Sequence, residues 1–479
     1  MRPLRRVAEE EFVLIVVLAA FGTVFLAVFP PQLLVADSWL TLVAGREVWE
    51  HGLPEHDELT VLGLGRTWTD QQWLAQLFFY GVHSAGGHAF LAVAGGAFVV
   101  TAFVLSAAGA RSLGAGPRAL VLVFFPVLLA APWAWTIRAQ LVALPLFTGL
   151  IWLLASEARR PSRRAYLVFP LLVLWANVHG SVALAALLTM FLGGLELVSS
   201  RGRSGVRSLA LILLPPLAML ATPYGPATTL RYYHLLLVDP PFPRELVTEW
   251  QRADPGWDTL AFYVLAALAL VVVLAGRRRL TTFDVCTLVF TFAGALLAIR
   301  GIPWFALACM VLLPVAIGRR LEGPEPLPRK QVNGALSFGA VGVLAVVVVA
   351  ALVRSDAWYS RNWPEGAVAA VRHAGDPSEL RVYATSRDAD WILWRIPELR
   401  GRLAYDVRFE IYDQDTFERT VRFKGEQGDD WKSIADGFNV VVLDTASKPS
   451  HVDDFLAELG ARALYRDDRI TVVLRQQTS

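Results

Sequence analysis

The stretch from Val35 to Thr60 concentrates carboxylates directly after a long run that contains no charged residue. Its acids are Asp37, Glu47, Glu50, Glu55, Asp57 and Glu58, with Trp39 and Trp49 among them. A carboxylate can accept a proton in catalysis, cap a helix or simply face solvent. Asp37 stands at the expected start of a helix and fits an N-cap and a catalytic role equally well. The other five acids are predicted to face solvent.

Further polar side chains lie next to apolar runs. They are Arg138, Asn177, His179, Glu249, Trp250 and Arg300. Arg138 is consistent with contact to lipid headgroups and equally with contact to a substrate phosphate. His179 can cap a hairpin or take part in chemistry. Glu249 beside Trp250 suits sugar recognition, although tryptophan is also common at membrane interfaces.

The chain as a whole is strongly apolar, so these residues depend on membrane-embedded elements for their positions. Of its 479 residues 55% are hydrophobic and 18% are charged, whereas soluble domains average about 25% charged residues. The sequence therefore predicts a polytopic α-helical membrane protein with a soluble part. Cys286 and Cys309 lie inside apolar runs, so neither a disulfide framework nor a metal-ligand spacing is indicated. No nucleic-acid partner is expected.

Eleven segments are apolar enough to be predicted as transmembrane helices, for which roughly 17–25 residues are typical. They are 12–30, 89–109, 119–135, 139–155, 165–176, 181–199, 208–222, 259–275, 281–299, 302–318 and 335–353. The first is longer than the apolar core of a signal peptide and lacks a cleavage site, so it is expected to be retained. Short polar breaks near His179 and Arg300 divide two close pairs, which are predicted to be hairpins.

The distribution of Lys and Arg predicts the orientation of these helices. Alternate short segments, beginning with the N-terminus, contain 19 Lys and Arg, whereas the segments on the opposite side contain seven. This bias places the N-terminus inside the cell, and the odd number of spans then places the C-terminus outside. Merging either close pair would invert every later loop and remove the bias.

Two domains are predicted, a transmembrane bundle over 1–354 and an extracytoplasmic α/β domain over 355–479. The bundle has a long outer loop, 31–88. In that loop a helix is expected from Asp37 to Gly52, possible as an interfacial helix, and a second begins near Thr69. The C-terminal region alternates short strand-like and helix-like stretches. Strands are predicted near 380–386, 438–445 and 469–476, and helices near 364–374 and 451–465.

In this topology all the candidate residues lie at the outer face, where ionisable groups at the edge of a bundle usually face a polar cavity or a partner. An outer cavity covered by loop 31–88 and the C-terminal domain is the simplest expectation. The C-terminal domain itself has a polar and aromatic run. It contains Trp391, Trp394, Asp406, Arg408 and Asp413. This run is predicted to be a packed core with a solvated rim, and glycan binding is the alternative.

Several ordered motifs resemble one family. They are "DSWLTLVAGREVWEHGLPEHDELT", "WTDQQWLAQLFFYGV", "IRAQL", "LLVLWANVHG", "TPYG", "RGIPWFAL" and "DWILWRIPELRGRLAYDVRFEIY". Together they cover nearly the whole chain, and their order is similar to that of a poorly characterised bacterial subgroup of the GT-C superfamily of membrane glycosyltransferases. That resemblance implies a multi-pass protein of the bacterial plasma membrane with an extracytoplasmic active face.

The resemblance also implies roles for residues. An acid in the first outer loop acts on the acceptor, which makes Asp37 the general base. The donor is a sugar on a polyprenyl phosphate, whose leaving phosphate Arg138 or Arg300 would stabilise. The acceptor is a glycan, a lipid or a protein. Asp57, Asp70 or Glu249 would bind sugar hydroxyls or a divalent metal. The outer loop has no D-x-D pair, so no metal ligand is assigned, although a divalent metal is compatible with the family.

The chain departs from the family pattern at two places. Thr41 stands where the family has a histidine, and Gln71-Gln72 stands where it has a His-Glu pair. These departures favour the alternative function, a non-catalytic cell-envelope assembly protein that binds a lipid or a partner. A transporter is less favoured, because the cytoplasmic side is predicted to offer no polar residues within the spans.

Overall fold

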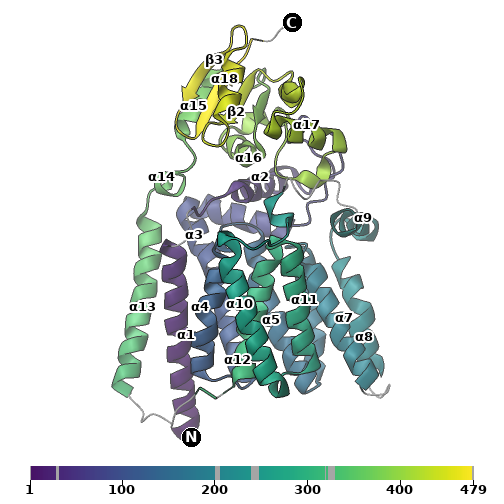
Figure 1. Cartoon of the computed structure of the whole chain (residues 1–479), viewed down its shortest axis with the longest axis vertical. Coiled ribbons are helices and arrows are strands. Elements are labelled where there is room, and N and C mark those ends of the chain that lie inside the picture. The colour runs from purple at the N-terminus through teal and green to yellow at the C-terminus, as the bar shows by residue number, and fades with distance from the viewer. Residues whose placement is uncertain are drawn as a thin grey trace. The chain divides into compact units, whose positions relative to one another are not determined.

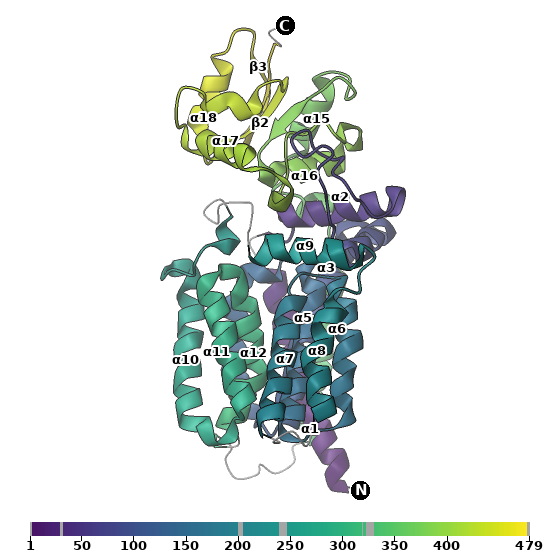
Figure 2. The same ribbon diagram turned by 90° about the vertical axis from the view of Figure 1, so that its right-hand side faces the viewer.

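The computed structural model describes residues 2–28, 32–199, 205–238, 247–318, 320–321 and 330–476, and its contacts divide the chain into two compact units (Figures 1 and 2). The membrane unit comprises Met1–Leu33, Ala89–Pro223 and Val247–Arg354. The α/β unit comprises Leu34–His88, Tyr224–Leu246 and Ser355–Ser479. The sequence predicts a boundary at 354/355, and the α/β unit adds two earlier segments to the C-terminal region.

The membrane unit is built from helices that overlap all eleven predicted segments. They are α1 (Arg2–Val28), the later part of α3 (Trp73–Ser112), α4 (Pro117–Ala130), α5 (Gln140–Arg159), α6 (Val168–Ala176), α7 (Val182–Ser199), α8 (Gly205–Met219), α10 (Leu260–Gly276), α11 (Thr282–Leu297), α12 (Ile302–Ile317) and α13 (Lys330–Val353). Within the described residues six helices are long and apolar enough to cross a membrane, and four apolar helices are shorter. The protein is therefore a membrane protein, and eleven spans remain a prediction.

Helix α12 forms the centre of the membrane unit. It packs against α4, α5, α10 and α11, and every residue from Ile302 to Ala316 is buried. A helix that is apolar on all sides is stable in a protein core or in lipid, and here other helices surround α12. Its N-terminal end follows the short turn η7 (Ile299–Gly301), so the core of the unit holds Arg300 in a fixed place.

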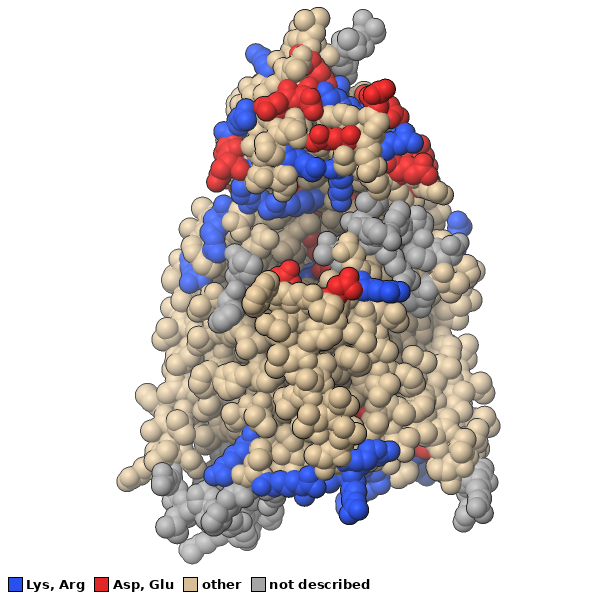
Figure 3. Space-filling view, in the orientation of Figure 1, with Lys and Arg blue, Asp and Glu red and all other residues tan. Residues whose placement is uncertain are grey.

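The predicted hairpins are present as separate helices, with breaks between α6 and α7 and between α11 and α12. Arg138, His179 and Arg300 lie in turns between helices, and both arginines are close enough to His179 to act on its charge. One end of the bundle carries exposed arginines. Figure 3 shows Lys and Arg gathered there beneath a band of uncharged residues, and they include Arg118, Arg160, Arg277, Arg278, Arg279 and Arg320. The side of the membrane on which each end lies remains a prediction.

The prediction that the spans carry no polar residues near this arginine-rich end is wrong. Glu196 of α7 and Asp284 of α11 are both buried there. Arg207 pairs with Glu196 at 2.5 Å and with Glu157 at 2.8 Å, and Arg159 pairs with Asp284 at 2.7 Å. The sequence assigns these arginines to loops, but in the structure they lie in α5 and α8, so the pairs join neighbouring helices and compensate the buried acids.

The α/β unit contains a four-stranded sheet in the order β1-β2-β4-β3, in which only β1 and β2 are parallel. The strands are β1 (Val382–Ala384), β2 (Val440–Asp444), β3 (Arg462–Arg466) and β4 (Ile470–Leu474). The helices of its C-terminal region are α14 (Asp356–Tyr359), α15 (Glu365–His373), α16 (Ser386–Arg395), α17 (Gln414–Gly425) and α18 (Pro449–Leu456). The three predicted strands and the helix near 364–374 are confirmed.

The helix predicted over 451–465 is wrong in its second half. Helix α18 ends at Leu456, and Gly460 has a φ of +76°, a left-handed conformation that favours glycine. The chain turns there and continues as β3, which pairs with β4. Helices α16 and α17 were not predicted.

The segment Leu34–His88 contributes two helices to the α/β unit. Helix α2 (Ala36–His51) packs its buried Trp39 side against α16 and ends at Gly52, as predicted. Its N-cap is Val35 and not Asp37, which is the second residue of the helix and lies in its first turn. Helix α3 begins at Trp73 and bends at Gly86 and Gly87 before it enters the membrane unit. The apolar side of α2 is therefore used for packing within the unit, and a place for this helix in the membrane interface stays a prediction.

Candidate functional site

The membrane unit brings several predicted site residues together around Arg138. This residue precedes α5 and is only 7% exposed. Its Nη1 donates a hydrogen bond of 2.6 Å to Glu249 Oε1, and its Nη2 donates one of 3.4 Å to the carbonyl of Trp133. A cation buried to this degree requires a partner. Glu249 of the turn η4 (Thr248–Trp250) supplies the opposite charge.

Arg300 extends the same group of residues. Its guanidinium lies 4.4 Å from the centroid of the Trp250 ring, a distance typical of a cation–π contact. The Ile299 N–H donates to the Gln251 carbonyl over 2.9 Å, which holds η7 against the loop that carries Glu249 and Trp250. Within the described part of the chain no carboxylate forms an ion pair with Arg300.

The charges of this group do not cancel. Two guanidiniums, Arg138 and Arg300, face one carboxylate, Glu249, which leaves one positive charge. Burial alone would raise the pKa of Glu249, but Arg138 and then Arg300 lower it below its ordinary value. Glu249 therefore stays ionised, and the group as a whole can still accept an anion. We call Arg138, Glu249, Trp250 and Arg300 the cation cluster.

His179 lies close enough to the cation cluster for both arginines to affect it. Burial, followed by Arg300 and Arg138, lowers the pKa of His179 to about 3, so the imidazole is neutral. The Ser181 N–H donates to Nδ1 over 3.1 Å, which makes Nδ1 the acceptor and places the proton on Nε2. His179 is thus a neutral hydrogen-bond donor. Asn177 instead holds the chain locally, with Nδ2 donating to the carbonyls of Val173 and Ala221, both at 2.9 Å.

Asp37, in the α/β unit, lies in the first turn of α2 and is half-buried. Its carbonyl accepts a hydrogen bond of 2.6 Å from the Thr41 hydroxyl, so the residue that replaces the family histidine acts within the helix backbone. A carboxylate at a helix N-terminus is stabilised as the anion by the helix dipole. Asp37 is therefore positioned as an accessible carboxylate.

Asp57 and Glu47 contradict the prediction that the other acids of the loop face solvent. Asp57 is fully buried and accepts hydrogen bonds from Arg408 at 2.7 Å, from the Leu59 N–H at 3.0 Å and from the Thr60 hydroxyl at 2.5 Å. Glu47 is buried against Arg400 at 2.5 Å. Glu50, Glu55 and Glu58 are exposed, as predicted. The oxygens of Asp57 are used by protein groups, so Asp57 is a structural residue.

Asp70 lies in the turn before α3 and is 3% exposed. Its N–H donates to the hydroxyl of Tyr224 over 3.2 Å. Burial raises the pKa of the Asp70 carboxyl to about 7, against the opposing effects of the Gln72 amide and Arg408. The carboxyl is therefore partly protonated at neutral pH and can both donate and accept a hydrogen bond.

Asp390 on α16 is an acid that the sequence reasoning missed. It is fully buried, and burial, followed by the charge of Asp406, raises its pKa well above the usual range. Asp37 acts in the same direction, so the two carboxyls are near neighbours in the α/β unit. The spacing Asp388-Ala389-Asp390, directly before the apolar run Trp391–Leu393, is the signal that could have identified it.

The polar and aromatic run of the C-terminal region is core rather than surface. Trp391 is fully buried, and Asp406 and Arg408 are 1% and 2% exposed. Arg408 also lies 4.1 Å from the centroid of the Trp68 ring. Asp413 is at the rim, paired with Arg66 at 2.5 Å. This arrangement agrees with a packed core and a solvated rim.

The predicted oxygen ligands do not suit a metal ion. Among the described residues no three His, Cys, Asp or Glu side chains are grouped so that they could hold one. Asp57 is occupied by Arg408, and Glu249 is occupied by Arg138. We therefore assign no chemical step to a metal.

Sequence comparison finds neither a matching family model nor a curated relative. Solved structures, in contrast, resemble the protein along nearly its whole length. ArnT from Cupriavidus metallidurans in the apo state is 16% identical with a TM-score of 0.55, and the match covers 97% of this chain and 98% of ArnT. The same enzyme bound to undecaprenyl phosphate gives 15% identity and a TM-score of 0.54, with 98% of each chain covered.

An oligosaccharyltransferase from Archaeoglobus fulgidus in the apo form is also similar. It is 13% identical with a TM-score of 0.50, and the match covers 91% of this chain and 69% of that one. At such low identity a shared fold does not by itself establish a shared reaction. The resemblance predicted from the motifs is confirmed at the level of the fold, since the chain has the fold of ArnT and of this oligosaccharyltransferase.

Proposed function

We propose that the protein is an integral-membrane glycosyltransferase that moves a sugar from a polyprenyl-phosphate donor to an acceptor hydroxyl on the extracytoplasmic side of the bacterial plasma membrane. The observation that carries the proposal is the cation cluster, in which the buried Arg138 and the half-buried Arg300 lie around Glu249 and Trp250. Its fold supports the class of donor, because ArnT has been crystallised with undecaprenyl phosphate.

Arg138 and Arg300 would bind the phosphate of the donor. The donor phosphate carries one negative charge, and more negative charge develops on it as the bond to the sugar breaks. Two guanidiniums offer several N–H donors for such a group. Neutral His179 can add a hydrogen bond from Nε2 without adding charge. Glu249 orients Arg138 at 2.6 Å and would yield part of that contact to the phosphate.

Asp37 would act on the acceptor. The acceptor oxygen forms a bond to the anomeric carbon, the bond from that carbon to the phosphate oxygen breaks, and the acceptor proton passes to Asp37. An aspartate of ordinary basicity can assist once the attacking oxygen has become acidic in the transition state. Because Asp390 has a raised pKa, it can remain protonated and does not place a second negative charge beside Asp37.

Replacing the proposed base tests the reaction. Asp37→Asn is expected to lower kcat for transfer from undecaprenyl-phosphate sugars by roughly 10²–10⁴-fold, because proton transfer loses its acceptor. Binding of undecaprenyl phosphate should be unchanged. Glu50→Gln is the matched control, since Glu50 is an exposed acid of the same helix. Undiminished turnover by well-folded Asp37→Asn would show that another group is the base.

Replacing a proposed phosphate ligand tests the donor site. Arg300→Gln is expected to weaken undecaprenyl-phosphate binding by about 10–100-fold, the loss typical of one charge-assisted hydrogen bond. Arg252→Gln serves as control, because Arg252 is an exposed arginine of the neighbouring loop. Titrating each purified variant in nanodiscs with undecaprenyl phosphate would measure the two affinities. Equal affinities for the two variants and the wild type would contradict the assignment.

The second candidate is a non-catalytic protein that binds a lipid or a partner in cell-envelope assembly. Thr41 favours it, because its hydroxyl is bound to the Asp37 carbonyl and supplies no substitute for the family histidine. Normal lipid-phosphate binding, combined with no transfer from any lipid-linked sugar and a stoichiometric protein partner on purification, would support this function over the enzyme.

A further inference from the structure

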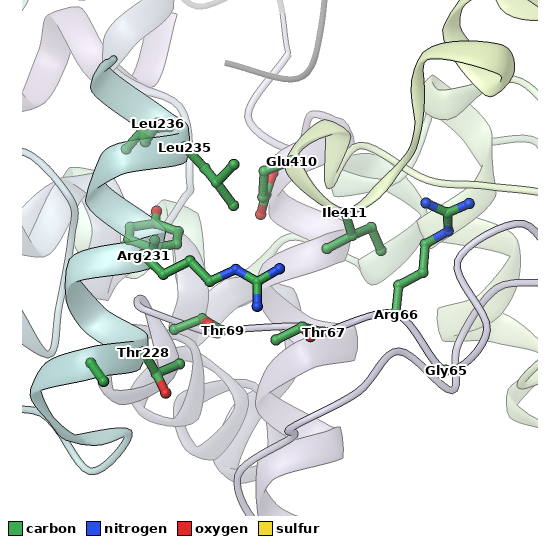
Figure 4. A pocket seen from close by; sticks show the side chains of 12 residues that line it. Gly65, Arg66, Thr67, Thr69, Thr228, Arg231, Leu235, Leu236, Glu410 and Ile411 are labelled. Atoms are coloured by element: carbon green, nitrogen blue, oxygen red, sulfur yellow. The ribbon is translucent and has the colours of Figure 1, made fainter. Parts of the chain in front are cut away.

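A cavity of about 550 Å³ opens within the α/β unit, and its described lining includes neither Asp37 nor a residue of the cation cluster (Figure 4). Three segments line it, namely Gly65–Thr69 of the loop before α3, the helix α9 (Gly225–Leu237) and the turn at Glu410–Ile411. Its volume lies within the range of about 300–1,000 Å³ that small-molecule sites occupy. The same segment, Leu34–His88, carries both one wall of this cavity and Asp37.

Arg231 offers a positive charge to a ligand in this cavity. Figure 4 shows its side chain reaching from α9 toward the middle of the cavity, so that the guanidinium ends between Thr69 and Glu410. The other arginine of the described lining, Arg66, is turned away and is paired with Asp413 at 2.5 Å. No described residue forms an ion pair with Arg231, which is exposed.

The remaining lining suits a hydroxylated ligand. The hydroxyls of Thr67, Thr69 and Thr228 and the carboxylate of Glu410 are groups that exchange hydrogen bonds with sugar hydroxyls. Leu235 and Ile411 add apolar surface of the kind that packs on the C–H face of a sugar ring. A hydroxylated ring with an apolar face therefore fits this lining better than a purely lipophilic ligand does.

We propose that this cavity binds the anionic sugar portion of the acceptor, with a phosphate or carboxylate on Arg231 and the sugar hydroxyls on the threonines and Glu410. This inference rests on the proposed transferase function, because it assigns the bound sugar to the acceptor. The chemistry is the same whether the sugar is soluble or is the headgroup of a lipid.

Binding measurements on the full-length protein in phosphatidylcholine nanodiscs test the proposal. Glucose 6-phosphate is expected to bind at least about tenfold more tightly than glucose or inorganic phosphate, because only it uses both kinds of group. Arg231→Gln should lose that advantage, Arg231→Lys should keep part of it, and Arg252→Gln should match the wild type. Equal binding of glucose 6-phosphate by the wild type and Arg231→Gln would overturn the proposal.

Nanodiscs that contain phosphatidylinositol identify the source of the ligand. Arg231-dependent competition by this anionic, hydroxylated headgroup would favour a lipid acceptor, and its absence, with glucose 6-phosphate still bound, would favour a soluble one. In a transfer assay with an anionic acceptor, Arg231→Gln should raise KM about tenfold and leave kcat unchanged. Arg231-dependent binding without turnover would refute the transferase function and keep a sugar site. Turnover by Arg231→Gln with the KM of the wild type would keep the transferase function and refute the sugar site.

Discussion

Asp57 and Asp70 lie in the same loop and are both buried, yet the partners of their carboxyl groups differ. Asp57 has a guanidinium, a backbone N–H and a hydroxyl as partners, which together replace the water it loses. Asp70 has no ion pair with any described residue, and burial raises its pKa to about 7. Two acids of similar burial therefore differ in whether a guanidinium accompanies the carboxyl.

The raised pKa of Asp70 predicts a pH-dependent stability. The value in the unfolded chain is 3.8 and the folded value is about 7, so between these the folded state holds a proton that the unfolded state has lost. The contribution of Asp70 to the free energy of unfolding is greatest below pH 3.8. It falls by about 1.4 kcal/mol per pH unit as the pH rises toward 7, and above pH 7 it no longer changes. Asp70→Asn should remove this slope when the midpoint of thermal unfolding is followed from pH 4.5 to 8.

The exposed Asp436 provides the control for that experiment. Asp436→Asn should leave the pH dependence as in the wild type. A slope for Asp70→Asn that matches the wild type would show that Asp70 does not carry the buried proton.

The sequence indicates which side chains belong to the candidate site better than it indicates which side chains contact one another. Arg138, Glu249, Trp250 and Arg300 were selected because each is polar beside an apolar run, and they lie together in the structure. Asp57 was misjudged because Arg408 stands 351 residues further along the chain. No local pattern reveals a pair at such a separation.

Among the elements, α2 and α3 approach one another closely at Gly45. A Cβ added there would lie 2.3 Å from the Gln76 carbonyl oxygen and 2.7 Å from Tyr80 Cβ. Glycine therefore allows contact between the helix that carries Asp37 and the start of α3. The position of Asp37 depends on this contact, although Asp37 itself takes no part in it.

Gly45→Val is expected to destabilise the α/β unit by roughly 1–3 kcal/mol, the usual consequence of forcing extra atoms into a packed contact. Gly81→Ala on α3 is the control. A Cβ at Gly81 meets nothing within 4 Å, and alanine favours a helix over glycine by roughly 0.5–1 kcal/mol. Thermal unfolding of both variants would measure the difference, and a Gly45→Val protein as stable as the wild type would contradict the packing.

The boundaries of elements followed from the sequence wherever a local signal existed. Gly52 ends α2, and the apolar runs identify every helix of the membrane unit. β3 was missed because its residues also fit a helical pattern, and pairing with β4 decides between the two structures. Tertiary contacts override short-range preference in such cases.

For the whole molecule, the α/β unit constrains how the chain crosses the membrane. Asp57 and Arg408 are in contact, so the segments that carry them must lie on the same side. An even number of crossings must therefore separate them. The ten predicted spans between residues 89 and 353 satisfy this condition, and merging one of the close pairs would violate it.

Single cysteines can test this sidedness in a Cys286→Ala, Cys309→Ala background. Glu55→Cys and Glu379→Cys, both at exposed positions of the α/β unit, should react with a membrane-impermeant maleimide on intact cells. Arg279→Cys, at the arginine-rich end of the membrane unit, should react only after lysis. Labelling of Glu55→Cys and Glu379→Cys from opposite sides would refute the even count.

The 351-residue separation of Asp57 and Arg408 also has a consequence during biosynthesis. The ribosome makes Asp57 long before its guanidinium partner, so the loop that carries Asp57 lacks this partner until the last quarter of the chain has been synthesised. Proteases that act on incompletely folded chains would meet this loop on every nascent molecule. A nonsense mutation after residue 354 would thus remove the tail and also leave the earlier loop, with Asp37, without its folded support.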